Sequence, residues 1–335
     1  MTLENDFNWF QEMEVSMWRS SMTWEDAKKR AQLVAKIRQF FLHNEVIEVD
    51  TPILSAGTVT DAHLDAFQTE YHFPSGKEPL FLQTSPEYAM KRLLASGYQS
   101  IYQICKSFRD EAFGRHHNPE FTMLEWYRVG LDHHQLMQEI DELLKCVLGS
   151  KPAEFISYQN VFINNTGIDP LSCDQGELIT YLRSKGKADD WLIHANCIDT
   201  LLQFIFCEFV ETNIGNKRPC FVFDFPISQA SLSKASDTDP RVAHRFECYY
   251  KGLELANGFN ELTDPDIQLK RFESDNIKRK LLGLPERPID QRFVDGLKAG
   301  LPECSGVAVG IDRLVMLALS KANIESVLTF TIENA

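Results

Sequence analysis

The sequence predicts an α+β fold in which a largely antiparallel sheet is flanked by helices. Two runs rich in aromatic and β-branched residues, 101–108 and 120–127, are separated by a polar loop, as expected for a long hairpin. A second hairpin is indicated where Lys251-Gly252 follows the strand-like run 246–250. The sequence contains neither a G-x-x-x-x-G-K-[ST] loop nor a G-x-G-x-x-G fingerprint, which disfavours a doubly wound nucleotide-binding fold.

Capping residues and glycines mark the expected helix boundaries. The first helix begins at Thr23 and ends near Asn44, and we expect Asn44 to adopt the left-handed conformation at its cap. A strand at 46–51 follows and ends at Pro52. The other expected elements are, in chain order, a helix at 88–95, a mostly helical stretch at about 132–215, a strand at 221–225, a helix from Asp264-Pro265, and a strand at 305–310 that leads into a helix at 311–320.

Composition excludes several classes of protein. The 335 residues include 34 Lys and Arg against 48 Asp and Glu, a net charge of −14, so a generic nucleic-acid binder with a basic surface is ruled out. The eight cysteines form no C-x-x-C pair, which excludes a zinc ribbon and a thioredoxin-type motif. No run approaches the ~18 apolar residues of a membrane span. The acidic N-terminus is unlike a secretory signal, so we expect a cytoplasmic protein with no membrane partner.

The first predicted hairpin carries the densest group of candidate functional residues. Arg109, at the end of one strand, can bind a phosphate through two hydrogen bonds, and Glu111 lies on the same strand face. Phe121, across the hairpin, can stack on a base. The alternative is a solvated hairpin with a surface ion pair, which is the commoner case for an isolated Arg-x-Glu triplet.

The second hairpin carries three glutamates. If Lys251-Gly252 forms a two-residue loop, Glu247 and Glu254 share one face as diagonal neighbours roughly 7 Å apart, and together they could hold Mg²⁺. Glu261 falls outside this alternation unless Gly258 allows a kink. The alternative is that these carboxylates are simply solvated.

A third candidate lies near the C-terminus, where the sequence Gly306-x-x-x-Gly310 precedes Asp312-Arg313. It places Arg313 in the first turn of a helix, where the helix dipole disfavours a cation, so a phosphate is expected to compensate. The alternative is a surface pair between Asp312 and Arg313, with the glycines needed only for packing.

Taken together and in order, these segments resemble motifs 1, 2 and 3 of the class II aminoacyl-tRNA synthetases, and specifically their lysine branch. The resemblance covers residues 25 to 320 and implies the class II antiparallel sheet flanked by helices. The matching segments are the dimer-forming helix and strand at 30–54, the F-R-x-E and H-x-x-x-F motif at 108–127, the closing arginine motif at 306–313, and two further stretches at 85–87 and 254–262.

The chain departs from the lysine branch at its start. Only about two dozen residues precede motif 1, where lysyl-tRNA synthetases carry an anticodon-binding domain. We therefore expect an N-terminal extension at 1–24 and a catalytic domain at 25–335, with a mostly helical insertion at about 132–215, and no tRNA substrate. The chain thus resembles the free-standing paralogues of lysyl-tRNA synthetase, which activate (R)-β-lysine and transfer it to elongation factor P.

Two single residues bear on this assignment. Ala308 supports it, because lysyl-tRNA synthetases generally have glycine at the matching position. Glu45 departs from the family, which often has glycine after the motif 1 helix.

The resemblance also implies ligands, partners and residue roles. It implies ATP and Mg²⁺, lysine or (R)-β-lysine as the small substrate, elongation factor P as the acceptor, and a homodimer formed through motif 1. The implied catalytic residues are Arg109 and Arg313. The implied ATP-binding residues are Arg109, Asp110, Glu111, Asn118, Phe121, Glu254, Leu255, Gly310 and Arg313. The implied substrate-binding residues are Ser85, Pro86, Glu87, Glu125, Tyr127, Asn257, Glu261 and Ala308, and the metal ligands are Glu247 and Glu254.

Two other functions stay open on sequence alone. A small-molecule amide ligase, such as the ammonia-dependent asparagine synthetase, would need basic residues around its amino-acid substrate, whereas Glu87, Glu125 and Glu261 are acidic. A catalytically silent synthetase-like regulator is disfavoured by the intact arginines and glutamates of the motifs.

Overall fold

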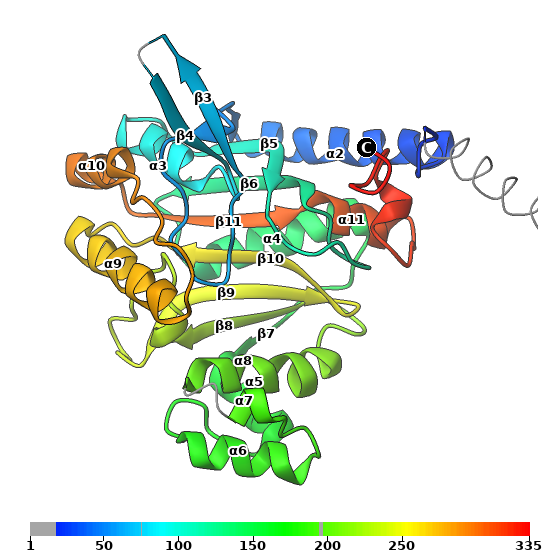
Figure 1. The fold of residues 1–335 in the computed structure, drawn as a ribbon. Coiled ribbons are helices and arrows are strands. Elements are labelled where there is room, and N and C mark those ends of the chain that lie inside the picture. The colour runs from blue at the N-terminus through cyan, green and yellow to red at the C-terminus, as the bar shows by residue number, and fades with distance from the viewer. Residues whose placement is uncertain (1–17, 75, 194–196) are drawn as a thin grey trace, which may run out of the picture.

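The computed structural model describes residues 18–74, 76–193 and 197–335. At its centre is an eight-stranded sheet with the order β1-β5-β6-β11-β10-β9-β8-β7 (Figure 1). Its strands are β1 (Ile47–Glu48), β5 (Ile101–Phe108), β6 (Glu120–Val129), β7 (Glu154–Ser157), β8 (Cys220–Pro226), β9 (Val242–Tyr250), β10 (Leu253–Asn260) and β11 (Cys304–Gly310). Only the two outer pairs, β1 with β5 and β7 with β8, are parallel, so the predicted α+β class with an antiparallel centre is confirmed.

Helices surround this sheet (Figure 1). The described helices are α2 (Trp24–His43), α3 (Glu87–Ala95), α4 (His133–Leu148), α5 (Tyr158–Thr166), α6 (Gln175–Ser184), α7 (Asp190–Ile193), α8 (Ile198–Ile205), α9 (Pro265–Leu281), α10 (Gln291–Gly300) and α11 (Ile311–Ala318). Figure 1 shows α2 running along the β1–β5 edge, while α5 to α8 gather below β7 at the opposite edge.

The start of α2 is as predicted, but its end differs in one residue. Thr23 Oγ1 accepts a hydrogen bond from the Asp26 backbone N–H at 3.2 Å and so caps the helix. The expectation for Asn44 is wrong, because Asn44 has φ −93° and Glu45 takes the left-handed conformation at φ +56°. The Asn44 side chain instead donates to the Phe40 carbonyl at 2.9 Å, which accounts for its right-handed backbone.

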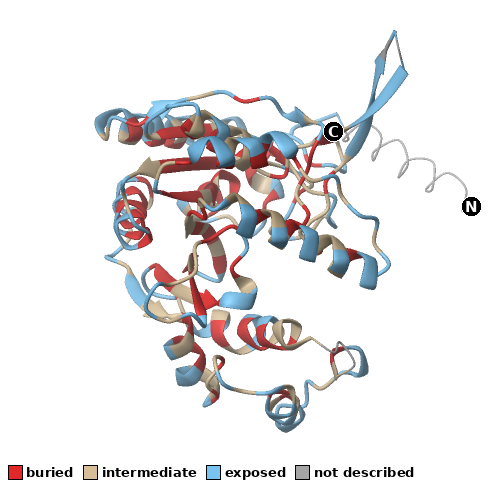
Figure 2. Ribbon diagram, turned by 90° about the vertical axis from the view of Figure 1, so that its left-hand side faces the viewer, coloured by how far each residue is buried: buried red, intermediate tan, exposed pale blue. Residues whose placement is uncertain are grey.

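The main hydrophobic core lies between one face of the sheet and the helices α2, α4 and α11. Phe41 of α2 stacks on Tyr102 with ring centroids 4.3 Å apart and meets Trp126 edge-on at 5.2 Å. Figure 2 shows the buried residues following the strands and the inner sides of these helices. The opposite face of the sheet is thereby left available for a cavity.

A separate cluster of buried residues joins α5, α6 and α8 to β8 and β9, on the face of the sheet opposite the main core. The helix α4, by contrast, packs into the main core against β9, β10 and β11. The division into an extension, a catalytic domain and an insertion stays a prediction, and most of the extension lies outside the described residues.

A second sheet has three strands and was not predicted. Its strands pair in the order β2 (Leu54–Ser55), β4 (Gly76–Leu82) and β3 (Gln68–Phe73). The β3–β4 hairpin projects from the body of the protein (Figures 1 and 2). Most of its side chains are exposed, so it lacks the alternation of apolar and polar residues that reveals a half-buried strand.

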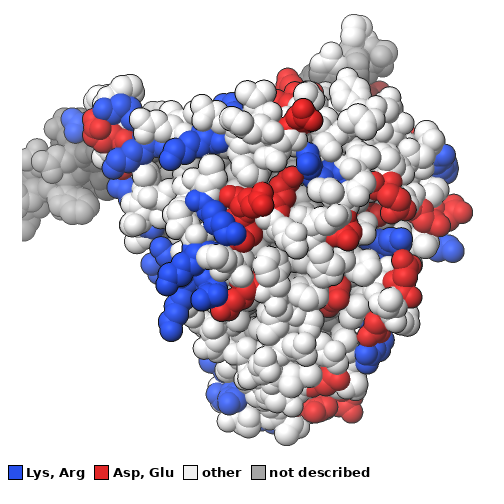
Figure 3. Space-filling view, turned by 180° about the vertical axis from the view of Figure 1, so that it is seen from behind, with Lys and Arg blue, Asp and Glu red and all other residues white. Residues whose placement is uncertain are grey.

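The surface carries both signs of charge. Figure 3 shows acidic and basic side chains on the rear face, with a group of Lys and Arg toward one edge and Asp and Glu scattered over the rest. Among the described helices, none combines the length and apolar character needed to cross a lipid bilayer.

Candidate active site

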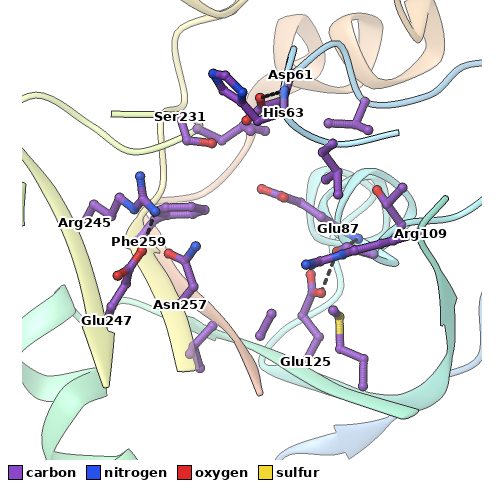
Figure 4. Close-up of a pocket in the computed structure, with 18 of the residues that line it drawn as sticks. Asp61, His63, Glu87, Arg109, Glu125, Ser231, Arg245, Glu247, Asn257 and Phe259 are labelled. Atoms are coloured by element: carbon purple, nitrogen blue, oxygen red, sulfur yellow. Dashed lines mark hydrogen bonds and ion pairs between the residues drawn. The ribbon is translucent and has the colours of Figure 1, made fainter. Parts of the chain in front are cut away.

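A cavity of about 820 Å³ lies over the centre of the sheet, on the face opposite α4. Figure 4 shows Glu87, Arg109 and Glu125 on one wall and Arg245, Glu247, Asn257 and Phe259 on the other. Every sequence-predicted site residue lines this cavity except Asp110, which is exposed and whose backbone N–H donates to the Asp65 carbonyl at 2.9 Å. The three motifs therefore converge on one site.

Arg109 is presented by the end of the first hairpin. Its backbone N–H donates to the Pro119 carbonyl at 2.9 Å, which closes the hairpin, and its guanidinium lies 5.2 Å from the centre of the Phe121 ring. The Arg109 Nε is buried without a hydrogen-bond partner among the described residues, and burial lowers the pKa of the guanidinium. A buried guanidinium with free donor capacity is suited to an anion such as a phosphate.

Arg313 lies in the first turn of α11, as predicted. It donates to the Glu254 carbonyl oxygen at 2.7 Å, and its other terminal nitrogen lies 3.1 Å from His117 Nε2. A surface pair between Asp312 and Arg313 is wrong, because Asp312 is only 2% exposed. Asp312 instead forms an ion pair with Arg30 of α2 at 2.7 Å, which leaves Arg313 directed into the cavity.

Glu125 forms the acidic wall on β6. The side chain is 2% exposed and accepts hydrogen bonds from Ser85 Oγ and from the Tyr127 hydroxyl, both at 2.6 Å. Burial, reinforced by the nearby Glu87 carboxylate, raises the pKa of Glu125 to about 7. Because the carboxyl is poised between its two charge states, a cationic ligand would favour its ionised form.

Lys91 is the residue that sequence reasoning missed at this wall. It is 1% exposed, and its ammonium lies 2.6 Å from Glu87 and 2.5 Å from Glu261. Burial lowers the pKa of Lys91, but the two carboxylates outweigh it, so the pKa lies above the ordinary value and Lys91 stays charged. Burial likewise raises the pKa of Glu261 to about 8, against the opposing effect of Lys91. The spacing of four residues from Glu87 was a signal for this pair.

Three carboxyl groups beside one internal cation allow this end of the cavity to take up further positive charge, because a bound cation would favour the ionised forms of Glu125 and Glu261. Asn257 adds a further acceptor, because its Oδ1 is buried without a hydrogen-bond partner in the described chain. Its neighbour on β11, Ala308, also pairs with Glu125 and forms part of the floor. A Cβ on Gly306 would lie 2.3 Å from the Tyr127 ring and 2.5 Å from Glu261, so only glycine fits there.

Glu247 and Glu254 lie at the other end of the second hairpin, on the predicted register. Burial and the neighbouring Glu247 raise the pKa of Glu254 to about 7. Glu247 accepts hydrogen bonds from Arg245 at 2.5 Å and from the Tyr249 hydroxyl. Glu211 in the turn Glu211–Asn213 also lines the cavity, and burial raises its pKa too, although nothing in its sequence context marked it.

A β-bulge brings Glu261 into the same cavity. The pairing of β10 with β9 shifts by one residue between Glu254 and Ala256, so the alternation of faces changes there. The kink is therefore at Leu255 rather than at Gly258. The Leu255 side chain packs in the main core, so any contact it makes with a nucleotide comes from its backbone.

The Asn118 side-chain amide is hydrogen-bonded to two backbone groups of the protein. Its Nδ2 donates to the Glu120 carbonyl at 2.6 Å, and its Oδ1 accepts from the Ile332 backbone N–H at 3.1 Å. These bonds tie the motif 2 loop to the C-terminal residues. The second Nδ2 hydrogen is the group left for a ligand.

Comparisons with known proteins match nearly the whole chain. The model of a family described as tRNA synthetases class II (D, K and N) matches residues 9–334. A curated relative from Vibrio atlanticus (strain LGP32) is 53% identical over 317 residues, which cover 94% of this chain and 98% of the relative. A relative from Salmonella typhi is 51% identical over 327 residues, covering 96% and 99%. Both relatives are named elongation factor P--(R)-beta-lysine ligase.

Proposed function

The chain belongs to the class II tRNA synthetases of the D, K and N group, and we propose that it activates (R)-β-lysine, or lysine, as an adenylate and transfers it to a lysine of elongation factor P. The single observation that carries this proposal is the distribution of charge in the cavity. Glu87, Glu125 and Glu261 surround one buried cation, while Arg109 and Arg313 line the remainder. A substrate with two amines and one carboxylate matches that distribution.

In the proposed first step, the amino-acid carboxylate attacks the α-phosphorus of ATP, a new P–O bond forms, and pyrophosphate leaves. No general base is needed because the carboxylate is already ionised. Arg109 would neutralise the α-phosphate and Arg313 the terminal phosphates, so catalysis consists of positioning and charge stabilisation. The adenine would stack on Phe121, with Glu111 and Asn118 as its polar neighbours.

The residues at the Glu254 end fit a divalent cation. Burial and the adjacent Glu247 disfavour the ionised form of Glu254, and a bound cation would reverse that preference. Glu247 already accepts hydrogen bonds from Arg245 and Tyr249, so the Glu254 carboxylate has more acceptor capacity left for a cation. Mg²⁺ held here would supply positive charge beside the phosphates of ATP.

In the proposed second step, the neutral acceptor amine attacks the carbonyl carbon of the adenylate, an amide bond forms, the bond from that carbon to the phosphate oxygen breaks, and AMP and the proton of the amine leave. The relatives' name assigns elongation factor P as the protein that they modify. The acidic pocket argues against an enzyme that amidates aspartate. The aspartate side chain is negatively charged and would face Glu125 and Glu261, which are also acidic.

An exchange assay with three substrates tests this proposal. The purified chain is incubated with ATP, labelled pyrophosphate, and lysine, (R)-β-lysine or aspartate, and we expect exchange with the diamines only. Adding elongation factor P should then increase its mass by one β-lysyl group, whereas lysine tRNA should stay uncharged. Exchange with aspartate, or none with any diamine, contradicts the proposal.

Arginine variants locate the chemistry within the cavity. Arg109→Ala and Arg313→Ala should each reduce exchange by roughly 100-fold or more, because each removes an oriented charge from the transition state. Arg292→Ala, on the exposed side of α10, is the matched control and should exchange normally. Unchanged urea unfolding of all three variants shows that the effect is local. Normal exchange in either cavity variant would remove that arginine from the mechanism.

We also propose a homodimer formed through motif 1. Trp24 and Leu42 of α2 and Ile47 of β1 are exposed apolar side chains in or beside this segment, as an interface requires. Light scattering at micromolar concentration should give twice the 38.4 kDa chain mass. A cytoplasmic location stays a prediction, because it rests on N-terminal residues outside the described chain.

A further inference from the structure

We propose that His133, Asp224 and His244 form a binding site for one zinc ion, outside the active-site cavity. The three residues come from separate elements: His133 begins α4, Asp224 lies in β8, and His244 lies in β9. None of them lines the cavity. Two imidazoles and one carboxylate are a ligand set that suits zinc.

The two ligand distances to Asp224 are close to those around a tetrahedral ion. Asp224 Oδ1 lies 3.3 Å from His244 Nδ1 and 3.7 Å from His133 Nε2, and the three ligand atoms all lie within 4.8 Å of one another. Zinc binds nitrogen and oxygen at about 2.0–2.2 Å, so two ligands of a tetrahedral ion lie about 3.3–3.6 Å apart. The fourth position would be left to water.

The buried ring nitrogens of His133 are the second observation that points to a ligand. The residue is 3% exposed, yet neither ring nitrogen has a hydrogen-bond partner in the described chain. A buried polar group without a partner is destabilising, so such groups call for an explanation. The His133 ring also stacks on His244 with centroids 4.4 Å apart, which brings two imidazoles to one carboxylate.

The backbone of β8 is distorted at Asp224. This residue has φ +57°, and the pairing of β8 with β9 shifts register between Phe223 and Phe225. A left-handed conformation at a residue other than glycine is uncommon, and strained residues of this kind cluster at functional sites. The bulge places the Asp224 carboxylate beside both imidazoles. Zinc bound there would tie the start of α4 to the two strands.

Zinc titration of the metal-free protein tests the proposal. Chelator-treated full-length chain is titrated with Zn²⁺ by calorimetry, alongside His244→Gln and Asp224→Asn. We expect each variant to bind one ion fewer than the wild type, or to bind that ion at least tenfold more weakly. The matched control is His72→Gln, whose histidine is exposed on β3, and it should bind as the wild type does. Differences between variants also remove any contribution from the free cysteines.

A second measurement uses the wild type, so that the test does not depend on how well the variants fold. Co²⁺ added to the wild type should give the strong visible absorption of a four-coordinate site, and Zn²⁺ should abolish it by displacement. Zn²⁺ should also raise the melting temperature of the wild type by about 2 °C or more, and less for Asp224→Asn. Equal zinc stoichiometry and affinity in wild type and variants, or Co²⁺ spectra typical only of six-coordinate ions, would overturn the proposal.

Discussion

Replacing Lys91 with methionine tests whether the buried ammonium is needed to hold the acidic wall of the cavity in the folded chain. Lys91 and Glu261 are each 1% exposed, so the variant leaves a buried carboxylate without its cation. Breaking such a pair from one side typically costs about 3–5 kcal/mol. We therefore expect the variant to lose about 4 kcal/mol of unfolding free energy.

The pH dependence of this loss distinguishes the effect of the missing positive charge from the effect of poor packing by the methionine side chain. In the wild type, the raised pKa of Lys91 contributes stability at every pH below the ordinary value of 10.5, so this contribution is constant from pH 5 to 8. In the wild type the pKa of Glu261 is already raised to about 8, and without the ammonium it rises further, so the extra loss of the variant grows only as the pH increases above about 8. Urea unfolding at pH 7 and pH 9 measures the loss on either side of this pKa. Lys298→Met, an exposed substitution, is the control and should change stability by less than about 0.5 kcal/mol. A loss below about 1 kcal/mol, or one equal at both pH values, would refute the reasoning.

Three further outcomes are expected. Gly306→Ala should abolish diamine-dependent exchange without preventing folding, because the new methyl group meets Tyr127; exchange above about a tenth of the wild-type rate would contradict this. The KM for the diamine should rise by up to about tenfold per pH unit below pH 7, because Glu125, with its pKa raised to about 7, must lose a proton to bind an ammonium; a flat KM from pH 6 to 8 would exclude that coupling. Arg30→Gln should lower the unfolding free energy by about 3 kcal/mol in urea, because Asp312 loses its buried ion pair, and a loss under about 1 kcal/mol would count against it.

The α+β class and the order of most elements could be predicted because the central strands are rich in aromatic and β-branched residues and are bounded by recognisable turns and capping residues. The family assignment made from the three motifs is confirmed. The strand β7 and the sheet of β2, β3 and β4 were not predicted, since they are short or exposed and their sequences show little periodicity. The error at Asn44 has a similar origin. Its side chain found a partner within the helix, which no cap rule anticipates.

The site residues likewise fall into those that the sequence predicted and those that it did not. Residues inside a motif, such as Arg109 and Glu125, were predicted because the motif fixes their spacing. Lys91 was missed because its role depends on Glu261, which lies far along the chain. His133 and Asp224 were missed for the same reason, and the left-handed backbone at Asp224 leaves no signature in its sequence.

The bulge in β10 determines which glutamates of this strand and its extension face the cavity. Glu254 and Glu261 are seven positions apart, an odd number, so a regular strand would direct them to opposite faces of the sheet. The register shift at Leu255 adds one residue and brings both to the cavity, while Leu255 fills the core on the other side. Seven residues of strand span about 20 Å, so the two carboxylates lie at opposite ends of the cavity. In the proposed mechanism Glu254 would serve the phosphates of the nucleotide and Glu261 the far amine of the amino acid, and the strand between them would set the length of substrate that the pocket accepts.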